Sequence, residues 1–287
     1  MIKIPDLSEM LDLNNIVDMT EFSCFQNEYD SSSEKYILNL AKSINIESDL
    51  LSTYNNWLKI NNKYFYFKSN NAFQELLIEK LFEEVKVRTV KHQIVKFNDE
   101  IGIISQNYRK PNLLYYYFSE IITGYNSENN FIEINNSIKK AMKHEDYENY
   151  LNQMFKIIAV DILFGQYDRW EYNVFFAKSK EHICLAPMFD NGCIFLEDYN
   201  DILIYGSCFG TLSFSTDYED YFTTDTLRKF SQMVCSLEKA LNFDLSKIFD
   251  NLEVEYKIKI CKEIRTQIQN YYDKHRKMVE KTLKFVR

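Results

Sequence analysis

The chain has 287 residues, enough for one large domain or two lobes of moderate size. Hydrophobic residues make up 46% and charged residues 26%, which is ordinary for a globular protein with its own core. The net charge of −8 and the pI near 5.2 lack the concentrated positive field of a nucleic-acid-binding module. We therefore expect no direct binding to nucleic acid.

The cysteines and the hydropathy pattern indicate the cellular compartment in which the protein is expected. The six cysteines are scattered and form no Cys-x-x-Cys pair, which argues against a zinc knuckle or a disulfide framework. No apolar run approaches the length of a membrane span, and the N-terminus lacks the apolar core of a signal peptide. We expect a cytoplasmic protein with no membrane partner, and export as an effector stays open.

The first 110 residues predict a leader followed by a small mixed lobe. Residues 1–50 form the leader, in which Ser31–Ser33 would cap a helix over 34–44. Residues 57–68 predict a hairpin, because two aromatic and β-branched runs flank a polar Asn-Asn turn. An apolar stripe predicts a helix over 72–85, and strands are expected over 89–97 and 100–105.

Beyond Pro111 the pattern becomes mainly helical. Short strands are expected over 174–177 and 182–185, and helices over 112–122, 131–142, 147–164 and from 226 to the end. The helix over 147–164 would end at Gly165, a natural C-cap. The elements predict an α+β fold with a small lobe over 51–110 and a helical lobe over 111–287.

The stretch over 165–192 carries the most informative polar residues. The loop after the expected helix contains Asp168, and Asn173 follows five residues later. The predicted hairpin then returns the chain to a Pro-Met-Phe-Asp-Asn-Gly motif that contains Asp190. We expect Asp190 to face Asn173 across a gap that fits Mg²⁺, a hard cation that prefers oxygen ligands. Asp168 would be free to act as the base toward a substrate hydroxyl.

A protein-kinase-type site requires these groups and, in addition, a lysine that a helix glutamate orients. Lys68 ends the second strand of the predicted hairpin, and Glu75 opens the next helix seven residues later. Glu79, one helical turn further on, is the alternative partner for the lysine. Arg169, next to the expected base, is either structural or a phosphate contact, and the sequence does not decide between them.

These segments together resemble the HipA-like kinases. That family consists of bacterial serine/threonine kinases with a two-lobed, kinase-related fold, and several members are toxins or secreted effectors. The resemblance spans residues 50–225. The segments that carry it are Trp57 with Tyr66–Lys68, Gln74–Leu77, Gly102–Tyr108, Gly165–Arg169 and Ala186–Gly192.

The resemblance implies an ATP- and Mg²⁺-dependent protein serine/threonine kinase, able to phosphorylate itself and acting with a small antitoxin-like partner. By position it implies that Lys68 is the ATP lysine and that Glu75 orients it. It also implies that Asp168 is the base and that Asn173 and Asp190 are magnesium ligands. Ser105 and Asn107 would lie near the adenine-binding hinge.

Two departures from the family pattern keep other functions open. The family usually has histidine after the Asp-Arg pair, where this chain has Trp170. The segment over 49–56, where a phosphate-binding loop is expected, contains no glycine, so its amides approach phosphate less freely. A pseudokinase that binds nucleotide or a partner without turnover is therefore one alternative. A lipid or small-molecule kinase is another, because such enzymes use the same set of Asp, Asn and Asp side chains as base and metal ligands.

Overall fold

The computed structural model describes residues 2, 4–11, 16–19, 56–60, 63–122, 131–196, 202–215 and 221–286. The predicted helix over 34–44, the hairpin turn at 61–62 and most of the glycine-free segment, residues 49–55, lie outside the described residues. In the described part of the chain, every helix is too short or too polar to cross a membrane.

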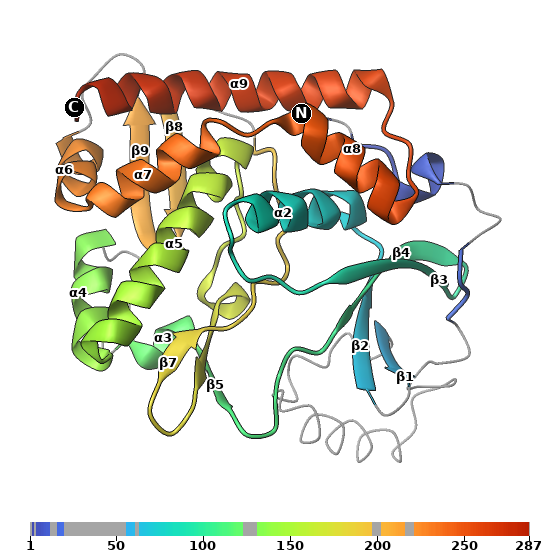
Figure 1. The fold of residues 1–287 in the computed structure, drawn as a ribbon, viewed down its shortest axis with the longest axis horizontal. Coiled ribbons are helices and arrows are strands. Elements are labelled where there is room, and N and C mark those ends of the chain that lie inside the picture. The colour runs from blue at the N-terminus through green and yellow to red at the C-terminus, as the bar shows by residue number, and fades with distance from the viewer. Residues whose placement is uncertain are drawn as a thin grey trace.

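A four-stranded antiparallel sheet with the order β1-β2-β4-β3 forms the small lobe (Figure 1). Its strands are β1 (Trp57–Ile60), β2 (Lys63–Lys68), β3 (His92–Phe97) and β4 (Glu100–Gln106). The predicted pairing of the first two strands is present, with Trp57 opposite Tyr66. Between β3 and β4, Asn98 and Asp99 both have positive φ, as a two-residue type I′ turn requires.

Helix α2 (Ala72–Glu84) follows β2 and is buried on most of its surface. The charged side chains of Glu75, Glu79 and Lys80 are buried with its apolar ones. Lys80 Nζ donates to Glu83 Oε2 at 2.8 Å and to Glu255 Oε2 of helix α8 (Leu245–Tyr256) at 2.7 Å. A helix buried in this way has its orientation set by packing on several sides. Glu75 is therefore presented to β2 from a fixed position.

The large lobe is mainly helical, and the main core of the protein lies where its helices pack against α2 (Figure 1). Its main helices are α4 (Phe131–Ala141), α5 (His144–Phe164), α6 (Tyr221–Lys229), α7 (Ser231–Ala240), α8 (Leu245–Tyr256) and α9 (Lys262–Lys284). The expected helices over 131–142 and 147–164 are present as α4 and α5. Helix α5 ends, as predicted, at Gly165, whose φ of 61° is the left-handed C-cap conformation.

The expectation of one helix over 112–122 is wrong. Residues Leu114–Tyr117 form strand β5, and only Phe118–Ile121 are helical, as α3. Strand β5 pairs with β6 (Phe175–Lys178), which pairs with β7 (Ile183–Leu185). Aromatic residues favour extended backbone, and pairing with a strand sixty residues away completes the sheet. The remaining hairpin comprises β8 (Ile202–Ser207) and β9 (Gly210–Ser215).

The described residues of the N-terminal segment contact both lobes. Leu7 and Met10, in the short helix η1 (Leu7–Met10), are buried in the main core. The Met10 carbonyl accepts a hydrogen bond of 2.7 Å from the backbone of Lys259, between α8 and α9. Further along, the backbone of Met19 donates to Lys96 in β3 at 2.7 Å. This segment thus passes from the large-lobe helices to the edge of the small-lobe sheet.

Candidate active site at the junction of the two lobes

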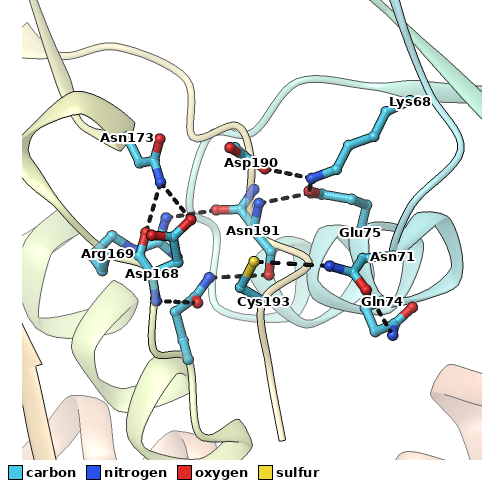
Figure 2. A network of polar contacts seen from close by, with 11 residues as sticks. Lys68, Asn71, Gln74, Glu75, Asp168, Arg169, Asn173, Asp190, Asn191 and Cys193 are labelled. Carbon is cyan, nitrogen blue, oxygen red and sulfur yellow. Dashed lines mark hydrogen bonds and ion pairs between the residues drawn. The ribbon is translucent and has the colours of Figure 1, made fainter. Parts of the chain in front are cut away.

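Lys68, at the end of β2, contacts two carboxylates, one from the helix that follows in the chain and one from a distant segment (Figure 2). Its Nζ donates to Glu75 Oε1 at 2.7 Å and also to Asp190 Oδ1. Burial alone would lower the pKa of Lys68, but the charges and hydrogen bonds of Glu75 and Asp190 outweigh burial and raise it. Lys68 is therefore a fully charged ammonium group held between two carboxylates.

Glu75 is the lysine's partner, and the alternative, Glu79, is wrong. Glu79 Oε2 lies 2.8 Å from His92 Nδ1 and accepts from the backbone of His92 at 3.2 Å. Lys91 Nζ lies 3.1 Å from the other Glu79 oxygen. Burial would raise the pKa of Glu79, but the bonds and charges of His92 and Lys91 outweigh it and lower that pKa. Glu79 thus fastens α2 to the start of β3.

The Asp190-Asn191-Gly192 turn packs closely against the beginning of α2. Glu75 uses Oε1 for Lys68 and accepts from the backbone N–H of Asn191 with Oε2 at 2.8 Å (Figure 2). Asp190 has a φ of 51°, in the left-handed region that Asp tolerates better than most residues. These contacts set the position of the Asp190 carboxylate relative to Lys68.

We expect Gly192→Ala to separate this turn from α2. A Cβ at residue 192 would lie 2.9 Å from Asn71 Cβ and 3.1 Å from Glu75 Oε1, so the neighbours must move. Overpacking of this kind typically lowers the free energy of unfolding by about 1–3 kcal/mol. Urea denaturation would measure the loss, and Cys235→Ala, at an exposed position of α7, is the control because it only removes an atom from the surface. Equal stability of the two variants would contradict the close packing.

Asn173 holds Asp168 in place. Its Nδ2 donates to the carbonyl oxygen of Asp168 at 2.7 Å and to Oδ2 of the same residue at 3.2 Å. The backbone N–H of Asp168 donates to Gln166 Oε1 at 2.9 Å. The side-chain oxygen of Asn173 points away from Asp168 in Figure 2. The Asn173 nitrogen therefore binds the loop residue Asp168, and the Asn173 oxygen is not directed at Asp168.

Arg169 is structural, which answers the question that the sequence left open. Its side chain is fully buried, and its Nε and Nη2 donate to the two oxygens of Asp161 on α5 at 3.0 and 2.9 Å. Its Nη1 donates to Asn191 Oδ1 at 2.8 Å. Sequence reasoning missed this network, although a carboxylate inside the apolar stripe of α5 is a signal of it. Arg169 thus connects α5 to the turn that carries Asp190.

A cavity of about 470 Å³ lies beside these residues, a size typical of small-molecule sites. Most of the predicted site residues line it, namely Lys68, Glu75, Ser105, Asn107, Asn173 and Asp190. Aromatic side chains line another part, and Tyr108 stacks on Phe189 with ring centroids 5.6 Å apart. Asp168 is not among the lining residues. The structure therefore brings the polar site residues together around an aromatic cavity and leaves the expected base outside it.

Among the residues that the structure describes, two groups of side chains offer ligand atoms for a metal. Asn173 and Asp190 both line the cavity and supply the hard oxygen atoms that suit Mg²⁺. Glu145, Asp146 and His182 form a second cluster, with ligand atoms within 4.8 Å of one another and none of the three lining the cavity. Asp146 accepts from the backbone of Ile183 and lies 3.0 Å from His182 Nδ1, so it clamps the β6–β7 hairpin onto α5.

A β-rich lobe, a helical lobe and a polar cluster at their junction define a two-lobed, kinase-like α+β fold. The proinflammatory kinase CtkA of Helicobacter pylori shares it, with a TM-score of 0.56 and 12% identity over 80% of this chain and 93% of CtkA. HipA of the Shewanella oneidensis MR-1 toxin–antitoxin system, solved with HipB and its operator DNA, has a TM-score of 0.51 and 10% identity over 78% of this chain.

The chain spans 59% of that HipA chain. No protein-family model matches the chain, and no curated protein matches its sequence. At 10–12% identity, the likeness to CtkA and HipA establishes the fold alone. The chemistry has to be argued from the site itself.

Proposed function

We propose that the chain is an ATP- and Mg²⁺-dependent protein kinase of the HipA-like type, which transfers the γ-phosphoryl group to a serine or threonine hydroxyl. One observation carries this proposal: Lys68 is held between Glu75 and Asp190 on the wall of a cavity that Asn173 also lines. Kinase sites need the same four groups for phosphate binding and metal binding. The two-lobed fold supports the proposal.

In this proposal the two ends of the cavity bind different parts of ATP. Lys68 contacts the α- and β-phosphates, and Glu75 keeps its ammonium group in position. Ser105, near the end of β4, and Asn107, directly after that strand, lie at the adenine end. The backbone N–H of Asn107 donates to Tyr64 at 2.8 Å, so this edge of the cavity is tied to β2. The aromatic lining suits a flat purine ring.

Asn173 and Asp190 would hold Mg²⁺. Their oxygen atoms fit this cation, and Lys68 supplies the positive charge beside Asp190 in the structure described. When bound, the cation neutralises negative charge on the phosphate oxygens. The Asn173 side chain would then act on both parts of the site, because its nitrogen also holds the Asp168 carboxylate.

Asp168 is the proposed base. It lies on a loop outside the cavity lining, and Asn173 and Gln166 fix it by hydrogen bonds of 2.7 to 3.2 Å. A carboxylate placed there accepts the proton of a hydroxyl group that approaches from outside the nucleotide cavity. The acceptor belongs to another protein or to the chain itself.

The proposal extends to the organisation and partners of the protein. We assign residues 51–110 to the small lobe, 111–287 to the catalytic lobe and 1–50 to an extension. The HipA structure contains HipB, so a small antitoxin-like protein is the partner that we propose for this chain. Co-purification of the chain with the product of a neighbouring small gene would test that part.

Incubation with γ-labelled ATP, Mg²⁺ and a panel of proteins tests the proposed reaction. We expect label on serine or threonine, and Lys68→Met should lower the initial rate by about 10²–10³-fold because it removes a preorganised charge from the phosphates. Lys63→Met, at the exposed start of the same strand, is the matched control and should transfer at the wild-type rate.

A nucleotide-binding pseudokinase is the second candidate, favoured by the glycine-free sequence over 49–56. Binding of ATP without transfer to the chain itself or to any protein of the panel would favour the pseudokinase and contradict the kinase. Calorimetry with a non-hydrolysable ATP analogue separates binding from transfer in the same preparation.

A further inference from the structure

The loop that carries Asp168 exposes three large aromatic side chains. Tyr167, Trp170 and Tyr172 are 46%, 50% and 59% exposed. Large apolar groups elsewhere in the described part of the chain are mostly buried, and the next aromatic residue, Phe175, is 5% exposed. Several exposed aromatic groups on one short loop are typical of an interaction site.

A fourth exposed apolar side chain, Leu196, belongs to the same region. Its backbone N–H donates to Gly165 at 3.1 Å, and the backbone N–H of Tyr167 donates to Cys193 at 3.1 Å. The segment after the Asp190 turn thus runs beside the loop, and Leu196 is 43% exposed. We call Tyr167, Trp170, Tyr172 and Leu196 the aromatic patch. Asp168 lies between two of its members in the chain.

The charges of this loop indicate what the aromatic patch binds. Over residues 165–174, which the structure describes without a gap, the one basic residue is Arg169. Arg169 is fully buried on Asp161, and the next basic residue, Lys178, is exposed but lies beyond the loop, at the end of β6. A phosphorylated lipid headgroup requires accessible cations, which this loop does not present. An apolar segment of a protein has no such requirement.

We propose that the aromatic patch docks the substrate, and that the substrate is an extended protein segment with a bulky apolar side chain within a few residues of its serine or threonine. This inference rests on the proposed kinase function. The acceptor hydroxyl must reach Asp168, so the neighbouring residues of the substrate pass over the side chains that flank this carboxylate. Tyr172 also lines the proposed nucleotide cavity, so the aromatic patch adjoins that cavity.

Tryptophan fluorescence provides a test that needs no catalytic turnover. The chain has two tryptophans, Trp57, which is 7% exposed, and Trp170, so Trp57→Phe leaves the reporter on the aromatic patch. The probes are peptides of about eleven residues with alanine at the acceptor position, long enough to span roughly 35 Å when extended. We expect peptides with a flanking leucine or phenylalanine to protect Trp170 from acrylamide quenching, and peptides with flanking lysine or glutamate to give no protection.

Variants give the second readout. Trp170→Ala should weaken binding of the leucine-flanked peptide about tenfold by calorimetry, as for a typical hot-spot residue, and leave the affinity for ATP unchanged. Phe285→Ala removes an aromatic group of similar exposure, 48%, at the end of α9 and should change neither affinity. If Trp57→Phe does not fold, the difference in quenching between wild type and Trp170→Phe gives the same signal.

Three results would overturn the inference: protection by phosphoinositide-containing vesicles but not by peptides, equal protection by charged and apolar peptides, or no protection by either probe. Transfer of label to the serine form of the leucine-flanked peptide is scored separately. Protection of Trp170 without transfer would contradict the kinase function and leave the docking surface standing.

Discussion

Replacing Asp168 with Asn is expected to slow phosphoryl transfer to serine or threonine by about a thousandfold. A positioned base contributes about 10²–10⁴-fold to such reactions, and the amide cannot accept the proton of the hydroxyl. The affinity for ATP should stay close to that of the wild type, because Asp168 is not among the residues that line the cavity. Initial rates with γ-labelled ATP, together with calorimetry on the same preparations, measure both quantities.

Asp190→Asn should behave differently from Asp168→Asn. Asp190 lines the cavity and contacts Lys68, so its loss should lower both the transfer rate and the effect of Mg²⁺ on ATP affinity. Asp225→Asn, on the exposed surface of α6, removes a carboxylate with a surface partner only and should change neither. A transfer rate within tenfold of wild type for Asp168→Asn would contradict the role of this residue as the base.

Arg169→Met is expected to lower the free energy of unfolding by about 3–5 kcal/mol. Both charges of the Arg169–Asp161 pair are fully buried, so removal of the arginine leaves a carboxylate in the core without its bidentate partner. The variant also loses the hydrogen bond to Asn191, beside Asp190. Urea denaturation in the absence of nucleotide measures the stability of the chain itself.

Two further variants distinguish the effect of leaving a buried charge unpaired from the effect of losing any arginine. Arg228→Met breaks an exposed pair with Asp225 and an exposed hydrogen bond to the Phe285 carbonyl, and it should change stability by at most about 1 kcal/mol. Combining Arg169→Met with Asp161→Leu removes both buried charges and should recover part of the loss. A loss of under about 1 kcal/mol in Arg169→Met alone would show that the pair is not needed to hold the loop.

Elements with strong local patterns were predictable from the sequence. The paired strands at Trp57–Ile60 and Lys63–Lys68, the helix that carries Glu75 and the C-cap at Gly165 follow from periodicity and capping rules, and all are present. The contact between Lys68 and Glu75 was also predictable, because a strand end and the following helix start lie close together in the chain.

Features that depend on distant partners were not predictable in this way. The strand at Leu114–Tyr117 requires β6, sixty residues later, and its local sequence is also compatible with a helix. The choice of His92 as the partner of Glu79 depends on how β3 packs on α2. The burial of Arg169 depends on Asp161 and Asn191 together, and no local pattern links these three positions.

The burial of α2 has a consequence for how such a protein is controlled. Swinging the helix outward would expose Phe73 and Leu77 to water and would separate the Lys80 ammonium group from Glu255. Displacement of this helix is therefore an unfavourable route for switching the protein off. Lys68 and Glu75 are already in contact, at 2.7 Å, in the chain alone. The geometry of this pair thus depends on the packing that buries α2.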